Sequence, residues 1–289
     1  MSDSFLVALL GDGVGPSLSP ALHMEEARRL GLDYDYRIVD LAGRAGLDLA
    51  DELRGLEEGG FDAANVTHPY KQAVVEHATR RSPTVRRLGS ANLVLLGPDG
   101  RTAHNTDCSG FRTALERFLA DGAAGSTTGR TVLQVGAGGA GLATAAALVD
   151  MGFARIVVHD LEPIATRALL ARFGDPAGPA RDRLLDGGGS LHDWLPRVDG
   201  VVHVTPVGMA AHPGVAFDVD RLRPDAWVAE VVYRPLETEL VRRARARGLA
   251  TLDGGAMAVA QAADSLRLIT GLDPDESRMR AHFARLVAT

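Results

Sequence analysis

The sequence predicts an α/β protein with two domains. Short apolar runs alternate with segments of helical period along almost the whole chain, a pattern typical of largely parallel sheets. A length of 289 residues is long for a single core, and a 46% hydrophobic, 24% charged composition is that of a globular protein. A spacer rich in Gly, Ser and Thr at residues 121–130 marks the start of the second part.

The first part of the chain alternates predicted strands with predicted helices. Apolar runs predict strands at Phe5–Leu10, Tyr34–Val39, Asp62–Thr67 and Asn92–Leu96. Segments of helical period predict helices at Pro20–Leu30, Asp48–Glu58 and Tyr70–Ala78. Gly97–Thr102 has the composition of a hairpin turn, and residues 109–120 predict a helix that leaves this part.

The second part continues the alternation after the spacer. It has predicted strands at residues 131–136, 155–160, 201–206 and 227–233, and a helix at 237–248. The stretch Gly174–Ser190 is rich in Pro and Gly and predicts an exposed loop region. The last 35 or so residues are predicted to be helical, because residues 257–271 are apolar at helical spacing.

Charge and cysteine content limit the classes of partner. A net charge of −6 argues against nucleic acid as the main partner. The single cysteine, Cys108, excludes an internal disulfide framework, fits a reducing cytoplasm and is expected to be buried and inert. The chain starts without a positive segment, and its first apolar run, Phe5–Leu10, is too short for a signal peptide or a membrane span. We therefore expect a cytoplasmic protein without a membrane partner; the sequence predicts no oligomeric state.

A glycine motif follows the predicted strand at residues 131–136 and opens an alanine-rich helix. In the spacing Gly136-x-Gly138-x-x-Gly141, the first glycine permits a tight turn and the second lets the backbone approach a pyrophosphate. The third allows close packing of helix and strand, and the helix N-terminus supplies N–H donors. The motif predicts a dinucleotide site formed by Gly136, Ala137, Gly138, Gly139, Ala140 and Gly141.

Asp160 indicates which dinucleotide binds. It ends the next predicted strand about 20 residues after Gly141, where an acid binds the ribose 2′-hydroxyl. A carboxylate accepts hydrogen bonds from ribose hydroxyls and repels a 2′-phosphate, and the next three residues, Leu161 to Pro163, include no basic side chain. The alternative is that Asp160 caps the following helix. We expect NAD rather than NADP.

Lys71 is the only lysine among 31 lysines and arginines. Arginine serves equally well as a solvated positive charge, whereas an ammonium can give up its proton. Together with Asn65 and Thr67, Lys71 lies where a predicted strand passes into a helix, and ligands bind at the carboxyl ends of parallel strands. A catalytic lysine is therefore the favoured interpretation, and a surface lysine is the alternative.

Two more polar segments lie at predicted helix starts. Ser17 and Ser19 precede Pro20, so Ser19 is the expected N-cap, and the two hydroxyls could form a carboxylate site. Asp107 follows Asn105 and Thr106 just before the helix at residues 109–120 and could bind substrate or cap that helix.

Eight segments, in order along nearly the whole chain, resemble the shikimate/quinate dehydrogenase family. They are SLSPALH, NVTHPYKQAV, LGSAN, HNTDCSGF, VGAGGAG, TPVGM, VVY and MAVAQA. The chain is most similar to the NAD-using quinate/shikimate branch, whose members carry an acid where Asp160 stands. The resemblance implies reversible oxidation of a hydroxyl on a carboxylated six-membered ring. It also implies an α/β substrate domain (residues 1–108 plus 254–289) and a Rossmann-type NAD domain (residues 109–253), with the C-terminal helices returning to the first domain.

The resemblance also implies roles for individual residues. Lys71 and Asp107 would form the catalytic pair. Ser17 and Ser19 would bind the substrate carboxylate, with Tyr233 near it where the domains meet. Ring hydroxyls or neighbouring groups would be held by Asn65, Thr67, Asn92 and Gln261. Beyond the glycine motif, the cofactor would contact Thr205, Val232 and Gly254.

Several positions depart from the family pattern and bear on the substrate. Leu93 stands where Thr is usual, Met24 and His203 where Asn is common, and Glu230 where Asp is common. The Ser17-x-Ser19 pattern favours shikimate, because quinate-using members often have Thr at the second position. Quinate, an aminated analogue, another small hydroxy-acid and a catalytically silent NAD-binding sensor remain alternatives. We expect no metal site, because His104, His203 and His212 lack a ligand spacing.

Overall fold

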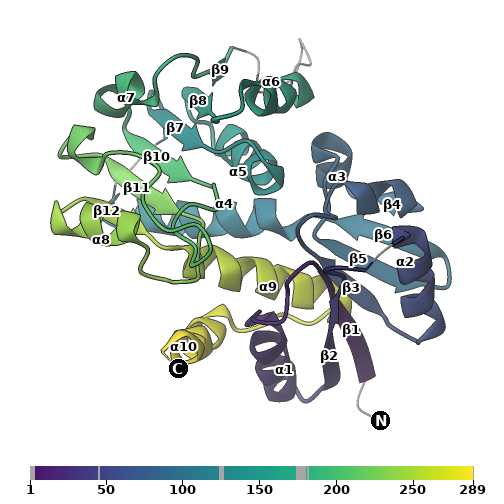
Figure 1. The fold of residues 1–289 in the computed structure, drawn as a ribbon. Coiled ribbons are helices and arrows are strands. Elements are labelled where there is room, and N and C mark those ends of the chain that lie inside the picture. Colours follow the sequence, from purple (N-terminus) through teal and green to yellow (C-terminus); the bar gives the residue numbers. More distant parts are fainter. Residues whose placement is uncertain (1–3, 45, 124–126, 174–179, 181, 289) are drawn as a thin grey trace. The chain divides into compact units, whose positions relative to one another are not determined.

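The computed structural model describes residues 4–44, 46–123, 127–173, 180 and 182–288 (Figure 1). The chain divides into two compact units, one formed by Met1–Ser109 with Val259–Thr289 and the other by Gly110–Ala258. Each unit contains one six-stranded sheet with helices around it, so the predicted α/β class is confirmed. None of the described helices has both the length and the apolar character that crossing a membrane requires.

The sheet of the first unit is mixed. Its strands are β1 (Ser4–Gly11), β2 (Asp33–Asp40), β3 (Ala63–Val66), β4 (Arg80–Arg81), β5 (Leu93–Gly97) and β6 (Gly100–His104), in the order β2-β1-β3-β5-β6-β4. Strands β1, β2 and β3 are parallel, whereas β5 is antiparallel to both β3 and β6. The β5–β6 hairpin turns within the predicted segment Gly97–Thr102.

Helices cover both faces of this sheet. They are α1 (Ser19–Arg29), α2 (Leu49–Glu58), α3 (Pro83–Leu88), the start of α4 (Thr106–Phe118), most of α9 (Gly254–Thr270) and α10 (Glu276–Val287). Side chains alternate between the faces of a strand. Leu10 accordingly packs in the same core as Leu53 of α2, whereas Leu9 shares a core with Leu266 of α9.

The predicted helix Tyr70–Ala78 is largely wrong. The chain forms only a 3₁₀-helix, η1 (Ala73–His77). The carbonyl of Lys71 accepts a hydrogen bond from the distant N–H of Ala91 at 2.7 Å, and the N–H of Val75 donates to Gln72 instead, at 3.2 Å. This tertiary bond replaces the α-helical one and fixes the backbone of Lys71. Strand β4 and helix α3 were not predicted. The start of α3 did have a signal in the sequence, because Ser82 is its N-cap and accepts from Val85 N–H at 3.2 Å.

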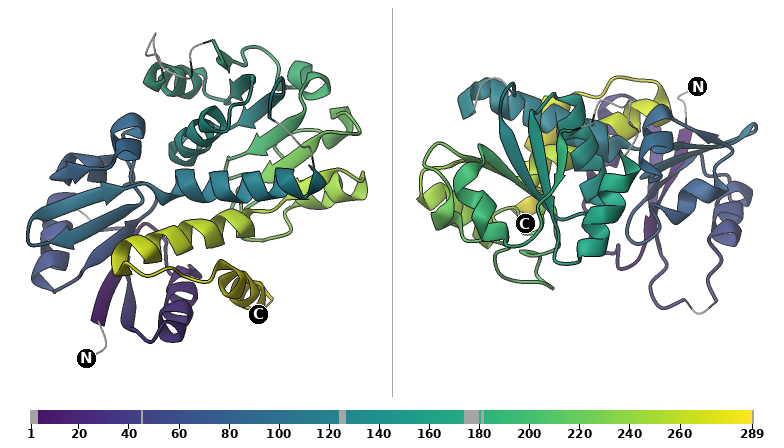
Figure 2. Two further views of the ribbon diagram at one scale, coloured as in Figure 1. Left: turned by 180° about the vertical axis from the view of Figure 1, so that it is seen from behind. Right: turned by 90° about the horizontal axis from the view of Figure 1, so that it is seen from above.

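The sheet of the second unit is entirely parallel (Figure 2). Its strands are β7 (Thr131–Val135), β8 (Arg155–His159), β9 (Leu184–Asp186), β10 (Gly200–His203), β11 (Trp227–Glu230) and β12 (Ala250–Leu252), in the order β12-β11-β10-β7-β8-β9. The helices after them include α5 (Gly139–Asp150), α6 (Pro163–Arg172), α7 (Leu191–Trp194) and α8 (Glu239–Ala246).

The loop prediction for Gly174–Ser190 is wrong at Leu184–Asp186. These residues form the edge strand β9, because their backbone pairs with β8. Residues 174–179 and 181 of this stretch, and 124–126 of the predicted spacer, lie outside the described residues.

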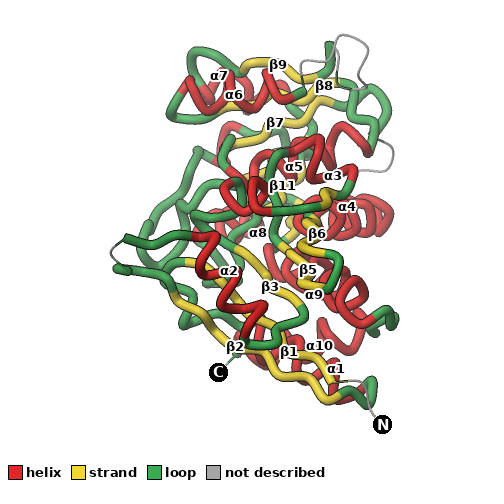
Figure 3. Tube along the Cα trace, turned by 90° about the vertical axis from the view of Figure 1, so that its right-hand side faces the viewer, coloured by secondary structure: helices red, strands yellow, loops and turns green. Residues whose placement is uncertain are grey.

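The C-terminal helices belong to the first unit, as the resemblance implied. Helix α10 lies beside α1 (Figure 3). The buried carboxylate of Glu26 on α1 accepts from Asp275 N–H and Arg278 Nε, each at 2.8 Å. One acid therefore anchors α10 to the body of the unit.

Replacing Glu26 with Ala should lower the free energy of unfolding by about 1 to 3 kcal/mol, because the Asp275 N–H and the Arg278 guanidinium lose their acceptor. Since the Arg278 side chain is 37% exposed, water takes over part of the lost interaction. Urea denaturation followed by circular dichroism measures the change. The neighbouring Glu25→Ala removes only surface pairs with Arg28 and Arg29 and should have little effect. Equal losses in both variants would contradict the anchoring role.

Candidate active site

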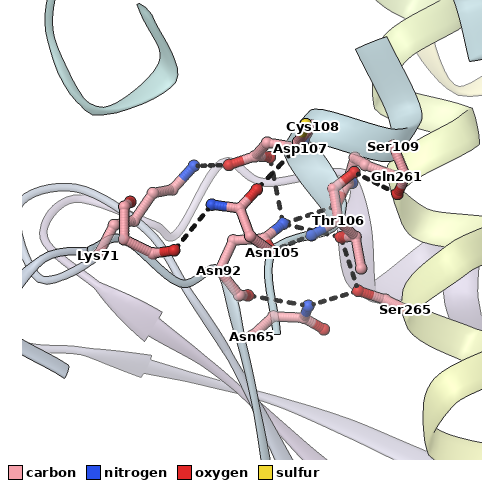
Figure 4. A network of polar contacts seen from close by, with 11 residues as sticks. Asn65, Lys71, Asn92, Asn105, Thr106, Asp107, Cys108, Ser109, Gln261 and Ser265 are labelled. Atoms are coloured by element: carbon pink, nitrogen blue, oxygen red, sulfur yellow. Dashed lines mark hydrogen bonds and ion pairs between the residues drawn. The ribbon is translucent and has the colours of Figure 1, made fainter. Parts of the chain in front are cut away.

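Lys71 forms an ion pair with Asp107 in the first unit (Figure 4). Lys71 Nζ lies 2.7 Å from Asp107 Oδ2, and the two side chains are only 20% and 9% exposed. Lys71 follows β3 in the turn before η1, and Asp107 lies in the first turn of α4, where the helix dipole stabilises a carboxylate. The only lysine is therefore a paired, mostly buried charge rather than a solvated surface one.

The cap of α4 is Asn105, not Asp107. Helix α4 begins at Thr106, earlier than predicted, and Asn105 Oδ1 accepts from the N–H of Cys108 at 3.1 Å. The Asn105 amide also donates to the carbonyl of Ser90 at 3.0 Å. The carboxylate of Asp107 is thus left to interact with Lys71.

Asn92 aligns Asp107 from the other side. Its Nδ2 donates to Asp107 Oδ1 at 3.1 Å and to Thr106 Oγ1 at 2.9 Å, and its Oδ1 accepts from Thr106 N–H at 2.6 Å. Gln261 Oε1 of α9 lies 3.5 Å from the same Nδ2. Both oxygens of Asp107 are thus held, one by an ammonium and one by an amide.

Asn65 lies beneath this network with both ends of its amide occupied. Its Oδ1 accepts from the Tyr36 hydroxyl at 2.9 Å, and its Nδ2 donates to Ser265 Oγ at 2.9 Å and to the carbonyl of Asn92 at 3.3 Å. Tyr36 and Ser265 were not identified from the sequence. Ser265 could have been, because it lies four residues after Gln261 on the same face of α9.

Ser17 and Ser19, which are predicted to bind the substrate carboxylate, lie at the start of α1. Helix α1 begins at Ser19 itself, so the prediction that Ser19 is the N-cap is wrong. Ser17 Oγ accepts from the N–H of Ser19 at 3.2 Å, which explains why a hydroxyl stands there. Among the described residues, no hydrogen bond joins Ser17, Ser19 or Thr67 to the Lys71 network.

Leu93 and Met24, two departures from the family pattern, have different surroundings. Leu93 is fully buried in an apolar core and pairs with Asn65 across β5 and β3. Met24 is 38% exposed on α1. Where the family usually has the hydroxyl of Thr, this chain therefore has an apolar side chain, at the position that pairs with Asn65.

The glycine turn of the second unit has the close backbone approaches that its motif predicts. Gly136 has a φ of +115°, and a side-chain Cβ there would lie 2.7 Å from the carbonyl oxygen of Val204. A Cβ at Gly141 would lie 2.7 Å from the carbonyl oxygen of Gly136. Gly138 is the N-cap of α5. Because glycine has no side chain to cap the helix, the N–H groups at its N-terminus are available to a phosphate.

A buried amide supports this turn and was not identified from the sequence. Gln134 on β7 donates to the carbonyls of Gly136 and Gly141, each at 2.9 Å, and accepts from the Thr144 hydroxyl at 2.9 Å. Its signal was a single amide inside an apolar strand. The close approach of the backbone here suits a pyrophosphate. The bonds from Gln134 fix the conformation of the turn.

Asp160 bridges the glycine turn and the segment after β8. Its Oδ2 accepts from Ala137 N–H at 2.8 Å, and its Oδ1 accepts from Glu162 N–H at 2.9 Å. The N-cap of α6 is Glu162, so the alternative that Asp160 is the cap is wrong. The next apolar side chains, Leu161 and Ile164, are 89% and 69% exposed.

The other predicted cofactor positions follow the carboxyl ends of β10, β11 and β12. Thr205 Cγ2 would lie 3.0 Å from a Cβ on Gly136, and a Cβ on Gly254 would lie 2.5 Å from the carbonyl oxygen of Val232. Tyr233 directly follows Val232 in the same unit. The positions therefore share the sheet edge where α/β proteins bind dinucleotides.

Known proteins resemble this chain over nearly its whole length. Residues 9–94 match the family described as "Shikimate dehydrogenase substrate binding domain". A protein of Pseudarthrobacter chlorophenolicus named "Shikimate dehydrogenase (NADP(+))" is 49% identical over 99% of this chain and 97% of its own length. The chain belongs to the shikimate/quinate dehydrogenase family. The resemblance seen in the sequence is thereby confirmed.

Within this family, the named relatives differ in cofactor. A protein of Corynebacterium efficiens named "Quinate/shikimate dehydrogenase (NAD(+))" is 44% identical over 98% of this chain and 99% of its own length. The solved quinate dehydrogenase from Corynebacterium glutamicum in complex with NAD is 42% identical, with a TM-score of 0.89 over 98% of this chain and 100% of that one. Both nicotinamide nucleotides occur among these names, so the choice between them depends on residues of this chain.

His23 extends the buried polar groups behind Asn65. Its ring lies 4.9 Å from that of Tyr36, between centroids, and its Nδ1 is 3.3 Å from the Tyr34 hydroxyl. Complete burial lowers the pKa of His23 from 6.5 to about 3, so the folded protein holds it neutral.

The pKa of His23 predicts a specific pH dependence of stability. Below pH 6.5 His23 binds a proton in the unfolded chain but not in the folded one. The free energy of unfolding therefore falls as the pH drops toward 3. The expected slope from this group is about 1.4 kcal/mol per pH unit. Replacing His23 with Gln should remove this contribution in denaturation curves measured across that range. The exposed His192→Gln serves as control, and identical slopes in all three proteins would refute the assignment.

Proposed function

We propose that this chain is an NAD-dependent dehydrogenase that reversibly oxidises shikimate to 3-dehydroshikimate. The observation that carries the proposal is the 2.7 Å pair between Lys71 and Asp107, held by Asn92. Membership of the family supports the reaction class, and the two hydroxyls at the start of α1 support a carboxylated substrate.

The protein's task in this reaction is to orient the ring and handle the hydroxyl proton. A bound nicotinamide nucleotide supplies the hydride chemistry. The Lys71 ammonium has three N–H donors, of which one reaches Asp107, so the others can donate to a substrate oxygen. These bonds stabilise negative charge on the oxygen, and the Lys71–Asp107 pair exchanges the proton with it. An arginine could supply the charge but not the exchange.

The choice of substrate rests on the serine pair. Ser17-x-Ser19 favours shikimate, and quinate is the alternative that the family names support. The apolar Leu93, opposite Asn65, favours neither ring and leaves an aminated analogue as a third candidate.

The choice of NAD rests on Asp160. Its carboxylate carries a full negative charge beside the glycine turn, where a 2′-phosphate would be repelled. The next side chains along the chain, from Leu161 to Ile164, include no basic residue that could offset this repulsion.

Replacing Lys71 with Arg should lower turnover of shikimate by about 100-fold or more, because proton exchange is lost while the positive charge remains. NAD binding should stay near the wild-type level. Initial rates of nicotinamide reduction, with shikimate and with quinate, measure the effect. Arg101→Lys is the matched control, since Arg101 forms a similar 2.7 Å ion pair with Glu57 away from the site.

Near-normal turnover in Lys71→Arg would contradict the proposed role of the lysine in proton exchange. Faster turnover of quinate than of shikimate by the wild-type protein would overturn the inference from Ser19 and keep the mechanism. A wild-type protein that binds NAD and shikimate but turns over neither ring would be the silent sensor instead.

Replacing Asp160 with Asn should reduce the preference for NAD over NADP by about tenfold, equivalent to roughly 1.4 kcal/mol, because the repelling charge is removed. An amide oxygen can still accept from Ala137 N–H, so the glycine turn should persist. The ratio of kcat/KM for the two nucleotides measures the preference. Glu162→Gln removes the neighbouring acid as a control, and an equal change in both variants would contradict a specific role for Asp160.

A further inference from the structure

His203 and Glu230 form a fully buried pair in the second unit. They are register partners at the carboxyl ends of the adjacent strands β10 and β11. His203 Nδ1 lies 2.8 Å from Glu230 Oε1, and the side chains are 1% and 0% exposed. Both positions depart from the Asn and Asp common in the family. The pair adjoins Thr205 and Val232, two of the predicted cofactor positions.

The surrounding hydrogen bonds show which atom carries the proton between them. Thr238 Oγ1 accepts from Val241 N–H at 3.2 Å, so its hydroxyl proton is available for Glu230 Oε2 at 3.0 Å. Val232 N–H donates to Glu230 Oε1 at 3.0 Å. Glu230 therefore acts as an acceptor at both oxygens, and His203 Nδ1 is the donor in the third bond.

We propose that His203 and Glu230 are positioning residues that make the Thr205 hydroxyl an acceptor for the carboxamide N–H of the nicotinamide cofactor. With its proton on Nδ1, the neutral His203 ring presents a lone pair at Nε2, and Thr205 Oγ1 lies 2.5 Å from it. The Thr205 proton is thus directed inward. Thr205 Oγ1 also accepts from Val207 N–H at 3.2 Å, which leaves one lone pair for a ligand.

A charged His203 would have the opposite effect. An imidazolium donates from both nitrogens, so Nε2 would donate to Thr205 and leave the hydroxyl proton free to point outward. The proposed role of Thr205 therefore requires the neutral ring.

The position of Thr205 in the sheet identifies the part of the cofactor it meets. Strands β10, β11 and β12 lie on one side of β7, and β8, whose end carries Asp160, lies on the other. Because Asp160 takes the adenosine ribose under the proposed function, on which this inference rests, Thr205 belongs to the nicotinamide half. There the carboxamide NH₂ is the obligate donor, whereas ribose hydroxyls can donate or accept.

The test compares NAD with 3-acetylpyridine adenine dinucleotide, in which a methyl group replaces the carboxamide NH₂. The ratio of kcat/KM for the two nucleotides, at saturating shikimate, should favour NAD in the wild-type protein. Thr205→Val should reduce that ratio by about tenfold, the worth of one hydrogen bond, and Thr205→Ser should preserve it. Glu230→Met should reduce it similarly although Thr205 is intact, because Nδ1–H then has no acceptor and the ring proton moves to Nε2, where Thr205 Oγ1 accepts it. Glu230→Gln should preserve the ratio, because the amide oxygen that Val232 N–H requires at this position also accepts from Nδ1.

A second measurement does not depend on turnover. In protein labelled with ¹⁵N-histidine, His203 should show a protonated Nδ1 and an unprotonated Nε2. The two nitrogens should exchange these states in Glu230→Met and keep them in Glu230→Gln. Thermal unfolding confirms that each variant folds. An imidazolium in the wild-type spectrum, or unchanged nucleotide ratios in folded Thr205→Val and Glu230→Met, would overturn the proposal.

If the wild-type protein turns over neither ring, the proposed function fails. The same comparison of nucleotides, made as binding affinities, still tests Thr205.

Discussion

Asn92 is the residue on which the order of the first unit depends. Its backbone joins two strands, because its N–H donates to His104 at 3.1 Å and its carbonyl accepts from Val66 at 2.9 Å. Its side chain meets the start of α4 and one oxygen of Asp107. The sheet, the helix and the Lys71–Asp107 pair therefore share one residue, whose side-chain amide serves the helix and the pair. An acid or a hydroxyl could not replace it, since only an amide both donates and accepts at the required atoms.

Both units place a buried amide beneath their functional groups. Asn65 lies under the Lys71 network and Gln134 under the glycine turn, and each uses both ends of its amide within the protein. An amide satisfies buried backbone and hydroxyl groups without the desolvation cost of a charge. Asn65, which resemblance assigns to the substrate, thus also has a structural duty that its family role does not reveal.

The sequence predicted what local pattern and elementary chemistry control. Apolar runs located the main strands, and the glycine spacing located the turn whose close approaches need glycine at Gly136 and Gly141. Two of the failures share a different cause. The helix predicted around Lys71 is displaced by a hydrogen bond from Ala91, and β9 exists because β8 offers its edge. Both depend on partners distant in sequence, which no local pattern contains. The same is true of Ser265, which gains its meaning from Asn65.

Overall similarity does not decide the cofactor, because it averages over the whole chain, whereas the proposed preference rests on one side chain. Relatives at 49% and 44% identity carry the names of different nucleotides. Asp160 acts locally, through its charge, and it also holds Ala137 and Glu162 in place. A change of cofactor preference at this position therefore has to supply a new acceptor for the glycine turn as well as a positive charge for a phosphate. This double requirement ties the specificity of the site to its folding. A substitution that only reversed the charge would lose the turn that binds either nucleotide.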